Sequence, residues 1–281
     1  MEKSKNLANV LILQLCFLIL LSLIYILNGV FPSIEFLFAI CIMGLVWKRQ
    51  YRNLLINLIP FFVLLLTYQS LRNFADNLTR SQIHIMDLIY LEKLIFHGII
   101  PSWFLQTKIL NSFIEKLVDP ITNILYMSHF VIPVIIAIIL WYREKRLYWQ
   151  FIIGLLIVSY LGFITYVFFP AAPPWWATKY GYLLDQPVTL APYFNPDLVE
   201  SEGPNPVAAM PSLHMAYSSY IAIFIYYAFN KKWIFLLPIA VGFSTVYLGH
   251  HYVIDLIAGL AYALIVFYFL RYIHVKNKKI I

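Results

Sequence analysis

Two histidines and an aspartate stand out at residues 250–255, where an otherwise apolar part of the chain reads His-His-Tyr-Val-Ile-Asp. Ionisable residues next to membrane-spanning segments are costly and usually serve a function. A helix that begins near His250 would place His251 and Asp255 on one face, because side chains four residues apart are neighbours on a helix. The carboxylate would then hold the proton on one ring nitrogen and leave the other nitrogen free to act as a nucleophile or a ligand.

A second group of polar residues lies upstream, in the sequence Met-Pro-Ser-Leu-His-Met at residues 210–215. Proline suits the first turn of a helix, since its missing N–H would have no partner there, so Pro211 predicts a helix start. The amides of Ser212 and Leu213 would then be free donors at a helix N-terminus, which is an arrangement that binds anions. His214 would stand one turn further in. Alone, this motif is more typical of a plain helix start with an interfacial histidine, but its combination with the downstream His-His-Asp group favours a functional site.

These residues resemble the signatures of a known family of membrane enzymes. The type 2 phosphatidic acid phosphatase superfamily carries Pro-Ser-Gly-His in one signature, and Ser-Arg, five residues, His, three residues and Asp in the next. The matching residues of this chain are Pro211, Ser212, His214, Ser244, His251 and Asp255. More narrowly, the chain resembles the inositol phosphorylceramide synthase branch, in residues 71–76, 96–106, 169–175 and 250–252. The whole resemblance covers roughly residues 68–270.

The resemblance implies a mechanism to which these residue types are suited. His251 would attack phosphorus and form a phosphohistidine, while Asp255 keeps the other ring nitrogen protonated. His214 would protonate the leaving oxygen and then take a proton from the incoming water or alcohol. Water as acceptor would make the protein a lipid phosphatase, and an alcohol such as a polyol would make it a head-group phosphotransferase. No metal ion or other cofactor is implied.

Three positions depart from the superfamily pattern where cations that bind the phosphate are expected. Thr165, Ala172 and Thr245 stand at those positions, and Leu213 replaces the glycine of the first matching signature. Phosphoryl transfer depends mainly on electrostatic stabilisation, so the positive charge must come from elsewhere. Arg72, with Asp76 four residues later, and Lys179 are the replacements that we favour, with Arg80 behind them. The full set of candidate substrate-binding residues is Arg72, Asp76, Lys179, Ser212, His250 and Tyr252.

The composition predicts a membrane protein with several spans. Apolar residues make up 62% of the chain and charged residues only 12%. The mean hydropathy is +0.78, so a water-facing surface of ordinary composition could not cover the molecule. The formal net charge of +7 comes from short Lys and Arg clusters between apolar runs. This distribution is typical of cytoplasmic membrane loops, and it argues against a nucleic-acid partner.

The apolar runs predict an all-α membrane bundle of about eight spans, with a six-helix core of the phosphatase type. Runs long enough to cross a bilayer lie at about residues 7–27, 53–69, 120–142, 148–169, 211–229, 233–249 and 252–270, and a shorter run lies at 32–47. We expect one membrane-embedded domain over residues 1–281, with N-terminal spans at 1–69 and the catalytic core at 70–270. Most Lys and Arg residues then fall on the side of both termini, which predicts cytoplasmic termini.

Two long connections are predicted on the extracytoplasmic side. Residues 70–119 mix charged and apolar groups, and they predict one or two helices at the membrane surface. Residues 170–209 are rich in proline, which blocks helix formation, and they predict an extended and semi-rigid loop. His214 and His251 lie on the same side of the predicted bundle, so the candidate chemistry falls on one face of the membrane.

Two other functions fit the same residues. His214, His250, His251 and Asp255 have the ligand types of a metal site or a proton relay in a transporter. The spans, however, lack the paired and broken helices that are typical of transporters. The missing cations would also fit a catalytically inactive lipid-binding protein. The leading interpretation is a membrane enzyme whose partners are a lipid phosphate, surrounding membrane lipids and an acceptor that is water, a polyol or another alcohol.

Overall fold

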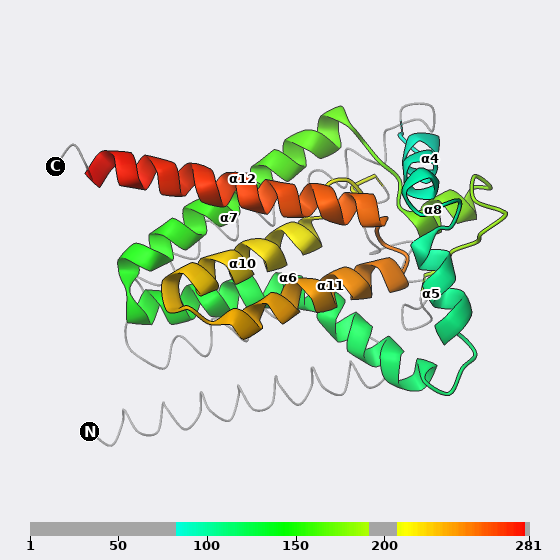
Figure 1. The fold of residues 1–281 in the computed structure, drawn as a ribbon, viewed down its shortest axis with the longest axis horizontal. Coiled ribbons are helices and arrows are strands. Elements are labelled where there is room, and N and C mark those ends of the chain that lie inside the picture. Colours follow the sequence, from blue (N-terminus) through cyan, green and yellow to red (C-terminus); the bar gives the residue numbers. More distant parts are fainter. Residues whose placement is uncertain (1–82, 191–206, 279–281) are drawn as a thin grey trace, which may run out of the picture.

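The computed structural model describes residues 83–190 and 207–278, which are mostly helical (Figure 1). The only β pairing in these two stretches consists of two single bridges, between His84 and Ala171 and between Ala171 and Ala208. The predicted all-α class is therefore confirmed. Several predictions fall outside the described residues: the spans at 7–27, 32–47 and 53–69, and the residues Arg72, Asp76 and Arg80.

Five apolar helices form a bundle in the described part of the chain. They are α6 (Glu115–Arg143), α7 (Lys145–Phe168), α10 (Leu213–Phe229), α11 (Leu236–Tyr247) and α12 (Val253–Lys278). Helices α6 and α7, and residues Val253–Ile273 of α12, are long and apolar enough to cross a membrane. A 3-10 turn, η2 (Lys232–Phe235), extends α11 to the shorter apolar segment Lys232–Tyr247. Each of these helices lies where the hydropathy of the sequence predicts a span.

Helix α10 lies in the middle of the bundle and packs against α6, α7, α11 and α12. Its Tyr220 is almost completely buried and stacks on Phe151 of α7, with ring centroids 5.8 Å apart. The Tyr220 hydroxyl donates a hydrogen bond of 3.2 Å to the carbonyl of Gln150. Buried aromatic rings contribute a large apolar contact area, so these contacts fix α10, and with it the polar residues at its N-terminus, within the bundle.

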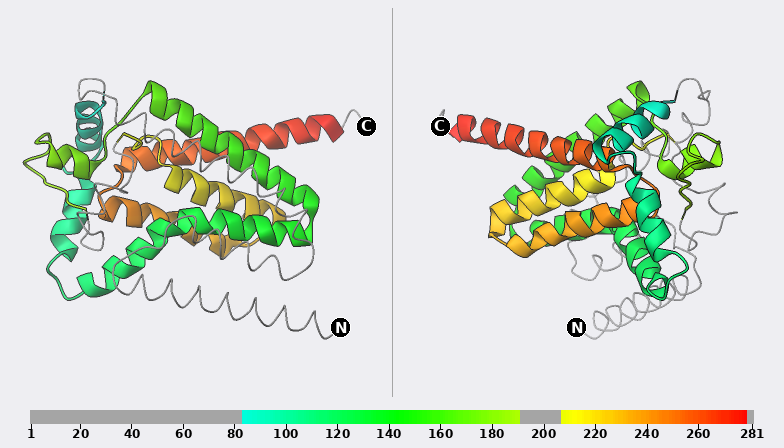
Figure 2. Two further views of the ribbon diagram at one scale, coloured as in Figure 1. Left: turned by 180° about the vertical axis from the view of Figure 1, so that it is seen from behind. Right: turned by 45° about the vertical axis from the view of Figure 1, so that its right-hand side comes forward.

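Three short helices cover one end of the bundle. They are α4 (Met86–Ile95), α5 (Pro101–Ile109) and α8 (Pro174–Lys179), and they remain at that end when the molecule is seen from behind (Figure 2). Helix α5 packs against α11 and helix α4 packs against α12. The described part of the predicted connection at 70–119 thus contains two short helices, α4 and α5, where the sequence predicts one or two, and it ends in the first turn of α6. Both short helices lie over the place where α11 ends and α12 begins.

The proline-rich connection contains a helix that the sequence analysis excludes. Helix α8 begins at Pro174, directly after Pro173, which is its N-cap. Proline is tolerated in the first turn because the amide that it lacks would have no helical partner there. The prediction of a wholly extended loop over residues 170–209 was therefore wrong for this part.

Candidate active site

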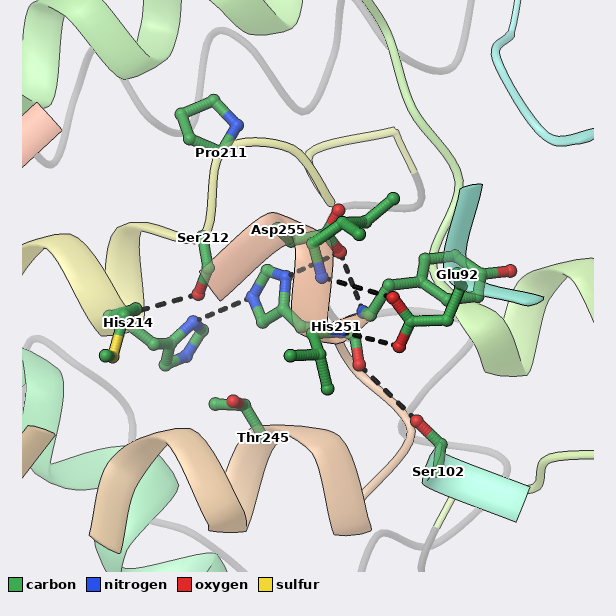
Figure 3. A network of polar contacts seen from close by, with 12 residues as sticks. Glu92, Ser102, Pro211, Ser212, His214, Thr245, His251 and Asp255 are labelled. Atoms are coloured by element: carbon green, nitrogen blue, oxygen red, sulfur yellow. Dashed lines mark hydrogen bonds and ion pairs between the residues drawn. The ribbon is translucent and has the colours of Figure 1, made fainter. Parts of the chain in front are cut away.

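His214, His251 and Asp255 come together at the covered end of the bundle (Figure 3). The distance from His214 Nδ1 to His251 Nε2 is 3.2 Å. The distance from His251 Nδ1 to Asp255 Oδ2 is 3.4 Å, which is long for a hydrogen bond but close for an ion pair. The three side chains form a row of contacts with His251 in the middle, and both His251 and Asp255 are buried.

The helix that carries Asp255 begins later than the sequence predicts. Helix α12 starts at Val253, so His251 lies in the loop before it and does not share a helix face with Asp255. The two residues still meet because Asp255 stands in the first turn and its side chain turns back toward the loop. Asp255 Oδ2 accepts a hydrogen bond of 2.8 Å from the amide of Tyr252, which is one half of a capping box. The expected helix boundary near His250 was wrong, although the expected pair forms.

The start of α10 differs from the predicted anion site. Helix α10 begins at Leu213 with Ser212 as its N-cap, so Pro211 precedes the helix instead of occupying its first turn. The amide of Ser212, which we expected to be a free donor, donates to the carbonyl of Asp255 at 3.0 Å. The Ser212 hydroxyl accepts a hydrogen bond of 3.3 Å from the amide of Met215. The prediction of a free Ser212 amide was wrong: Ser212 caps α10 and joins it to α12.

A glycine allows α12 to approach this cap closely. A Cβ atom on Gly259 would lie 2.3 Å from the carbonyl oxygen of Ser212 and 3.2 Å from the amide nitrogen of Ala216. Any side chain at this position would push the two helices apart. Because Gly259 lies one turn after Asp255, it sets how deeply that carboxylate sits beside α10.

The two neighbours of His251 are packed into the interior. The ring of His250 is buried and stacks on Tyr126 of α6, with centroids 4.2 Å apart. Burial lowers the pKa of His250 to about 3, so its ring is neutral at physiological pH. Tyr126 also stacks on His214, at 4.3 Å. Tyr252 is fully buried. The structure thus gives His250 and Tyr252 packing and backbone roles, and their contact with substrate stays a prediction.

The three residues at the positions where the superfamily pattern has cations are uncharged in this chain. Two of them, Thr165 and Thr245, use their hydroxyl groups in hydrogen bonds within the bundle. The Thr165 hydroxyl donates to a backbone carbonyl of its own helix and contacts the hydroxyl of Tyr262 at 2.7 Å. The buried Thr245 hydroxyl donates to the carbonyl of Gly242 at 3.0 Å. Ala172 is fully buried. The phosphate of a substrate therefore needs a positive charge from another part of the protein.

Of the proposed replacement cations, Lys179 is the one that lies among the described residues. Lys179 is exposed at the end of α8, and its Nζ lies 5.8 Å from the ring centroid of Tyr180. Arg72 and Asp76 lie outside the described residues. The roles of all three in substrate binding stay predictions.

A third histidine, which the sequence analysis did not single out, touches the site. The ring of His129 lies in the middle of α6, with its centroid 3.8 Å from that of His214. His129 Nδ1 lies 2.8 Å from the carbonyl oxygen of Tyr126, so this nitrogen carries the proton and donates it to that oxygen. The signal was present in the sequence, because an ionisable residue inside an apolar span is a functional candidate by default.

Glu92 of α4 is the second residue that the sequence analysis missed. Its side chain is fully buried, and its carboxylate accepts hydrogen bonds from the amides of Val253 and Ile254 at 2.8 and 3.2 Å. It shares a helix face with the buried Leu88 and Ile89. A glutamate aligned with apolar residues at helical spacing was the available signal.

The fold and the site together define a class of protein. An apolar helical bundle with two imidazoles in contact, one of them beside a carboxylate, is suited to group transfer through a histidine nucleophile. Among residues 83–190 and 207–278, no three His, Cys, Asp or Glu side chains converge as a metal ion would require. The apolar bundle and the contact between the two imidazoles are typical of a membrane enzyme with a histidine nucleophile.

The chain belongs to the PAP2 superfamily. A sequence model of this superfamily matches residues 98–269, which is more than half of the chain and includes His214, His251 and Asp255. The chain is thus an integral membrane enzyme that acts on lipid phosphoesters. This result favours the lipid phosphotransferase interpretation over the transporter and the inactive lipid-binding protein.

The curated relatives include synthases of phosphoinositol-containing sphingolipids. The chain is 28% identical over 241 residues to the phosphoinositol dihydroceramide synthase of Bacteroides thetaiotaomicron, which covers 79% of this chain and 78% of that one. It is 29% identical over 138 residues to the catalytic subunit of inositol phosphorylceramide synthase of Saccharomyces cerevisiae, which covers 42% and 33%. It is also 29% identical over 170 residues to the inositol phosphorylceramide synthase of Candida albicans, which covers 54% and 36%. The predicted resemblance to this branch is confirmed, and no solved structure matches.

Proposed function

We propose that this enzyme is a head-group phosphotransferase that moves a phosphorylated polyol from a lipid phosphodiester to the hydroxyl of a ceramide-class lipid. The observation that carries the proposal is the contact between His214 Nδ1 and His251 Nε2 at 3.2 Å, with Asp255 behind His251. The choice of substrates is supported by the match to the Bacteroides synthase, which extends over most of both chains.

In the first step, His251 Nε2 attacks the phosphorus of the donor lipid. The bond from phosphorus to the lipid alcohol breaks, and the polyol phosphate remains on His251 as a phosphohistidine. His214, which starts as the imidazolium with a proton on each ring nitrogen, gives the leaving oxygen the proton from Nδ1, the nitrogen that faces His251, and becomes neutral. Asp255 keeps His251 Nδ1 protonated and stabilises the positive charge that develops on the ring.

In the second step, the acceptor alcohol takes the place of the departed alcohol. His214 Nδ1 now has a free electron pair and accepts the proton of the acceptor hydroxyl as its oxygen attacks phosphorus. The N–P bond breaks and its electron pair returns to His251 Nε2. The product is a new phosphodiester, and both histidines regain their starting protonation states.

The surroundings of the two histidines favour an alcohol over water as the acceptor. His251 is 4% exposed and Asp255 is 0% exposed, and the rings of Tyr126 and His129 pack on His214. A site that excludes water protects a reactive phosphohistidine from hydrolysis. An alcohol group on a membrane lipid reaches such a site from the bilayer side.

The proposed site faces the extracytoplasmic side of the membrane, and both termini face the cytoplasm. Basic residues gather at the end of the bundle away from the histidines, in the turns from α6 to α7 and from α10 to α11, namely Arg143, Lys145, Arg146, Lys231 and Lys232. The C-terminal end of α12 points the same way (Figure 1). Cytoplasmic loops are enriched in Lys and Arg, which supports this orientation. We treat residues 1–281 as one domain with its catalytic core at 70–270.

The test is a transfer assay with phosphatidylinositol that carries a radioactive phosphate, in mixed micelles with the purified protein. Ceramide that carries the labelled phosphoinositol group should form only when ceramide is supplied, and His251→Ala should form none of this product. Lys231→Ala, at the far end of the bundle, is the matched control and should retain wild-type activity. Release of water-soluble labelled head group alone, with and without ceramide, would contradict the transferase and identify a hydrolase.

A further inference from the structure

We propose that Glu92 is a positioning residue that holds the first turn of α12, and with it Asp255, in line with His251. Glu92 belongs to α4, yet its buried side chain reaches the start of α12 (Figure 3). One carboxylate oxygen accepts from the amide of Val253 at 2.8 Å, and the other accepts from the amide of Ile254 at 3.2 Å. The inference rests on the proposed functions of Asp255 and His251.

Two carboxylates share the amides at this helix start. The first amides of a helix have no partner within the helix. Asp255 accepts from the amide of Tyr252, and Glu92 accepts from the next two amides along the chain. The helix dipole adds to the attraction, because the N-terminus of a helix favours negative charge. Without Glu92, the turn that carries Asp255 would lose two of these contacts and keep only the one that it makes itself.

His251 lies just outside this turn and is held by other elements. Its amide donates to the carbonyl of Thr245 in α11 at 3.3 Å. Its carbonyl accepts a weak hydrogen bond of 3.5 Å from Ser102 of α5. His251 is thus fixed by α11 and α5, whereas Asp255 is fixed by its own helix, by the backbone contact with Ser212 of α10 and by Glu92 of α4. The anchor that α4 provides is therefore one of the contacts that set the approach of Asp255 to His251.

Helix α4 is itself well anchored. Leu88 and Ile89, on the same face as Glu92, belong to a buried cluster that also contains Ala172, Trp176 and Tyr252. Because this packing fixes the backbone of α4, the Glu92 carboxylate is a firm attachment point for α12. Packing of this kind is what keeps a functional group within the narrow range of positions that catalysis requires.

The Glu92 carboxyl can change its charge near neutral pH. Burial raises the pKa of Glu92 to about 7, the two amide hydrogen bonds lower it, and the charge of Asp255 raises it. The buried phenol of Tyr252 also faces it. Lys93, the next residue of α4, pairs with Asp185 at 2.5 Å. The ionised carboxylate is the stronger acceptor for both amides, so the anchor weakens as the pH falls through about 7.

The experiment compares Glu92→Gln with Asp185→Asn. Both variants change a carboxylate to an amide, and Asp185 contacts the same helix through the exposed pair with Lys93. Glu92→Gln should lower kcat by about 10- to 100-fold, because small displacements of a reacting group cost about that much. KM for the donor lipid should stay within about twofold, since the donor does not contact Glu92. Asp185→Asn should change neither value.

The pH profile of kcat shows whether Glu92 positions Asp255 or only helps to stabilise the fold. The wild-type profile should contain a limb near pH 7 that falls toward acid pH, and Glu92→Gln should lack it. Glu92→Asp should restore this limb and part of kcat. Equal kcat in Glu92→Gln and Asp185→Asn would overturn the inference, as would a loss of kcat that matches the loss of folded protein.

Total head-group release, measured with and without ceramide, keeps the two proposals distinguishable. The rate of total head-group release by Glu92→Gln, divided by that of the wild type, tests the Glu92 anchor whether the enzyme transfers the head group to ceramide or to water. If the wild-type protein releases no head group at all, the proposed function fails and the anchor is tested by hydrogen exchange instead. Faster amide exchange at Val253 and Ile254 in Glu92→Gln than in Asp185→Asn supports the anchor, and equal exchange overturns it.

Discussion

The amide of Ser212 donates a hydrogen bond to the carbonyl of Asp255 at 3.0 Å, and this contact ties the start of α10 to the start of α12. His214 stands two residues after Ser212, so the two helices that bring His214 and Asp255 to His251 are joined through their backbones. A backbone contact of this kind does not adapt by a change of rotamer. The positions of the proposed acid and of the orienting carboxylate are therefore set by helix packing.

Gly259 is the residue that permits this packing, and Gly259→Ala should damage the enzyme. A Cβ atom there would lie 2.3 Å from the backbone oxygen of Ser212, which has no room to move. We expect kcat to fall at least about tenfold, because α12 must shift away from α10, and the melting temperature to fall as well. Gly242→Ala is the control, since its Cβ would meet only side-chain atoms at 3.4 Å or more. Equal effects of the two substitutions on kcat would contradict this account.

The different tasks proposed for the two histidines predict different responses to the leaving group. A donor with a p-nitrophenol leaving group needs no protonation, so His214→Ala should still form the phosphohistidine from it at a rate within about tenfold of the wild type. With a natural lipid donor the same variant should lose at least about a hundredfold. His251→Ala should form no adduct with either donor. The measurement is acid-labile phosphate on the protein after rapid quenching, and an adduct in His251→Ala would refute the assignment.

The raised pKa of Glu92 predicts that the contribution of this residue to the stability of the fold falls as the pH rises. The pKa of Glu92 is about 7 in the folded protein, against 4.5 for the free side chain, because burial disfavours the charge. The folded protein therefore binds this proton more tightly, so the stabilisation is fully present below the lower value and is lost as the pH rises through the upper one. The melting temperature of the wild type, minus that of Glu92→Gln, should fall by several degrees between about pH 5 and about pH 8. A difference between the two melting temperatures that stays constant over this pH range would contradict the raised pKa of Glu92.

The opposite signs of these two pH effects have a physical meaning. Protonation of Glu92 stabilises the fold by removing a buried charge, but it weakens the hold on the amides of Val253 and Ile254. The ionised form is thus less stable and, in our proposal, more active. Functional sites commonly carry such a cost in stability.

The helices and the grouping of the site residues could be predicted from the sequence for clear reasons. A span must satisfy its own backbone polar groups in lipid, which forces long apolar runs into helices, and the run at 148–169 became α7 (Lys145–Phe168). His251 and Asp255 lie close in sequence, and their spacing tolerates a change in the helix boundary because the first turn of α12 brings the carboxylate back to the loop.

The residues that the sequence analysis missed depend on contacts between distant parts of the chain. Nothing near Glu92 shows that it will meet Val253, since that contact joins residues more than 150 positions apart. The Ser212 amide is likewise occupied by a carbonyl from another helix, which no local rule for helix starts can reveal. Ser244, which belongs to the recognised signature, donates to the carbonyl of Thr122 at 2.8 Å and joins α11 to α6. The partners of these polar groups are set by tertiary packing, which the local sequence does not show.

The proposed orientation predicts which side of the membrane each end of the bundle faces. Lys108 on α5 and Lys231 before η2 are both exposed and lie at opposite ends. Each is changed to cysteine in turn, in a variant whose native Cys16 and Cys41 are serines. In sealed right-side-out vesicles, a membrane-impermeant maleimide should label Lys108→Cys at once and Lys231→Cys only after detergent is added, because the basic end stays inside. The reverse pattern would place the histidines on the cytoplasmic side, and labelling of both before detergent would show that the vesicles leak, which a trapped dye checks.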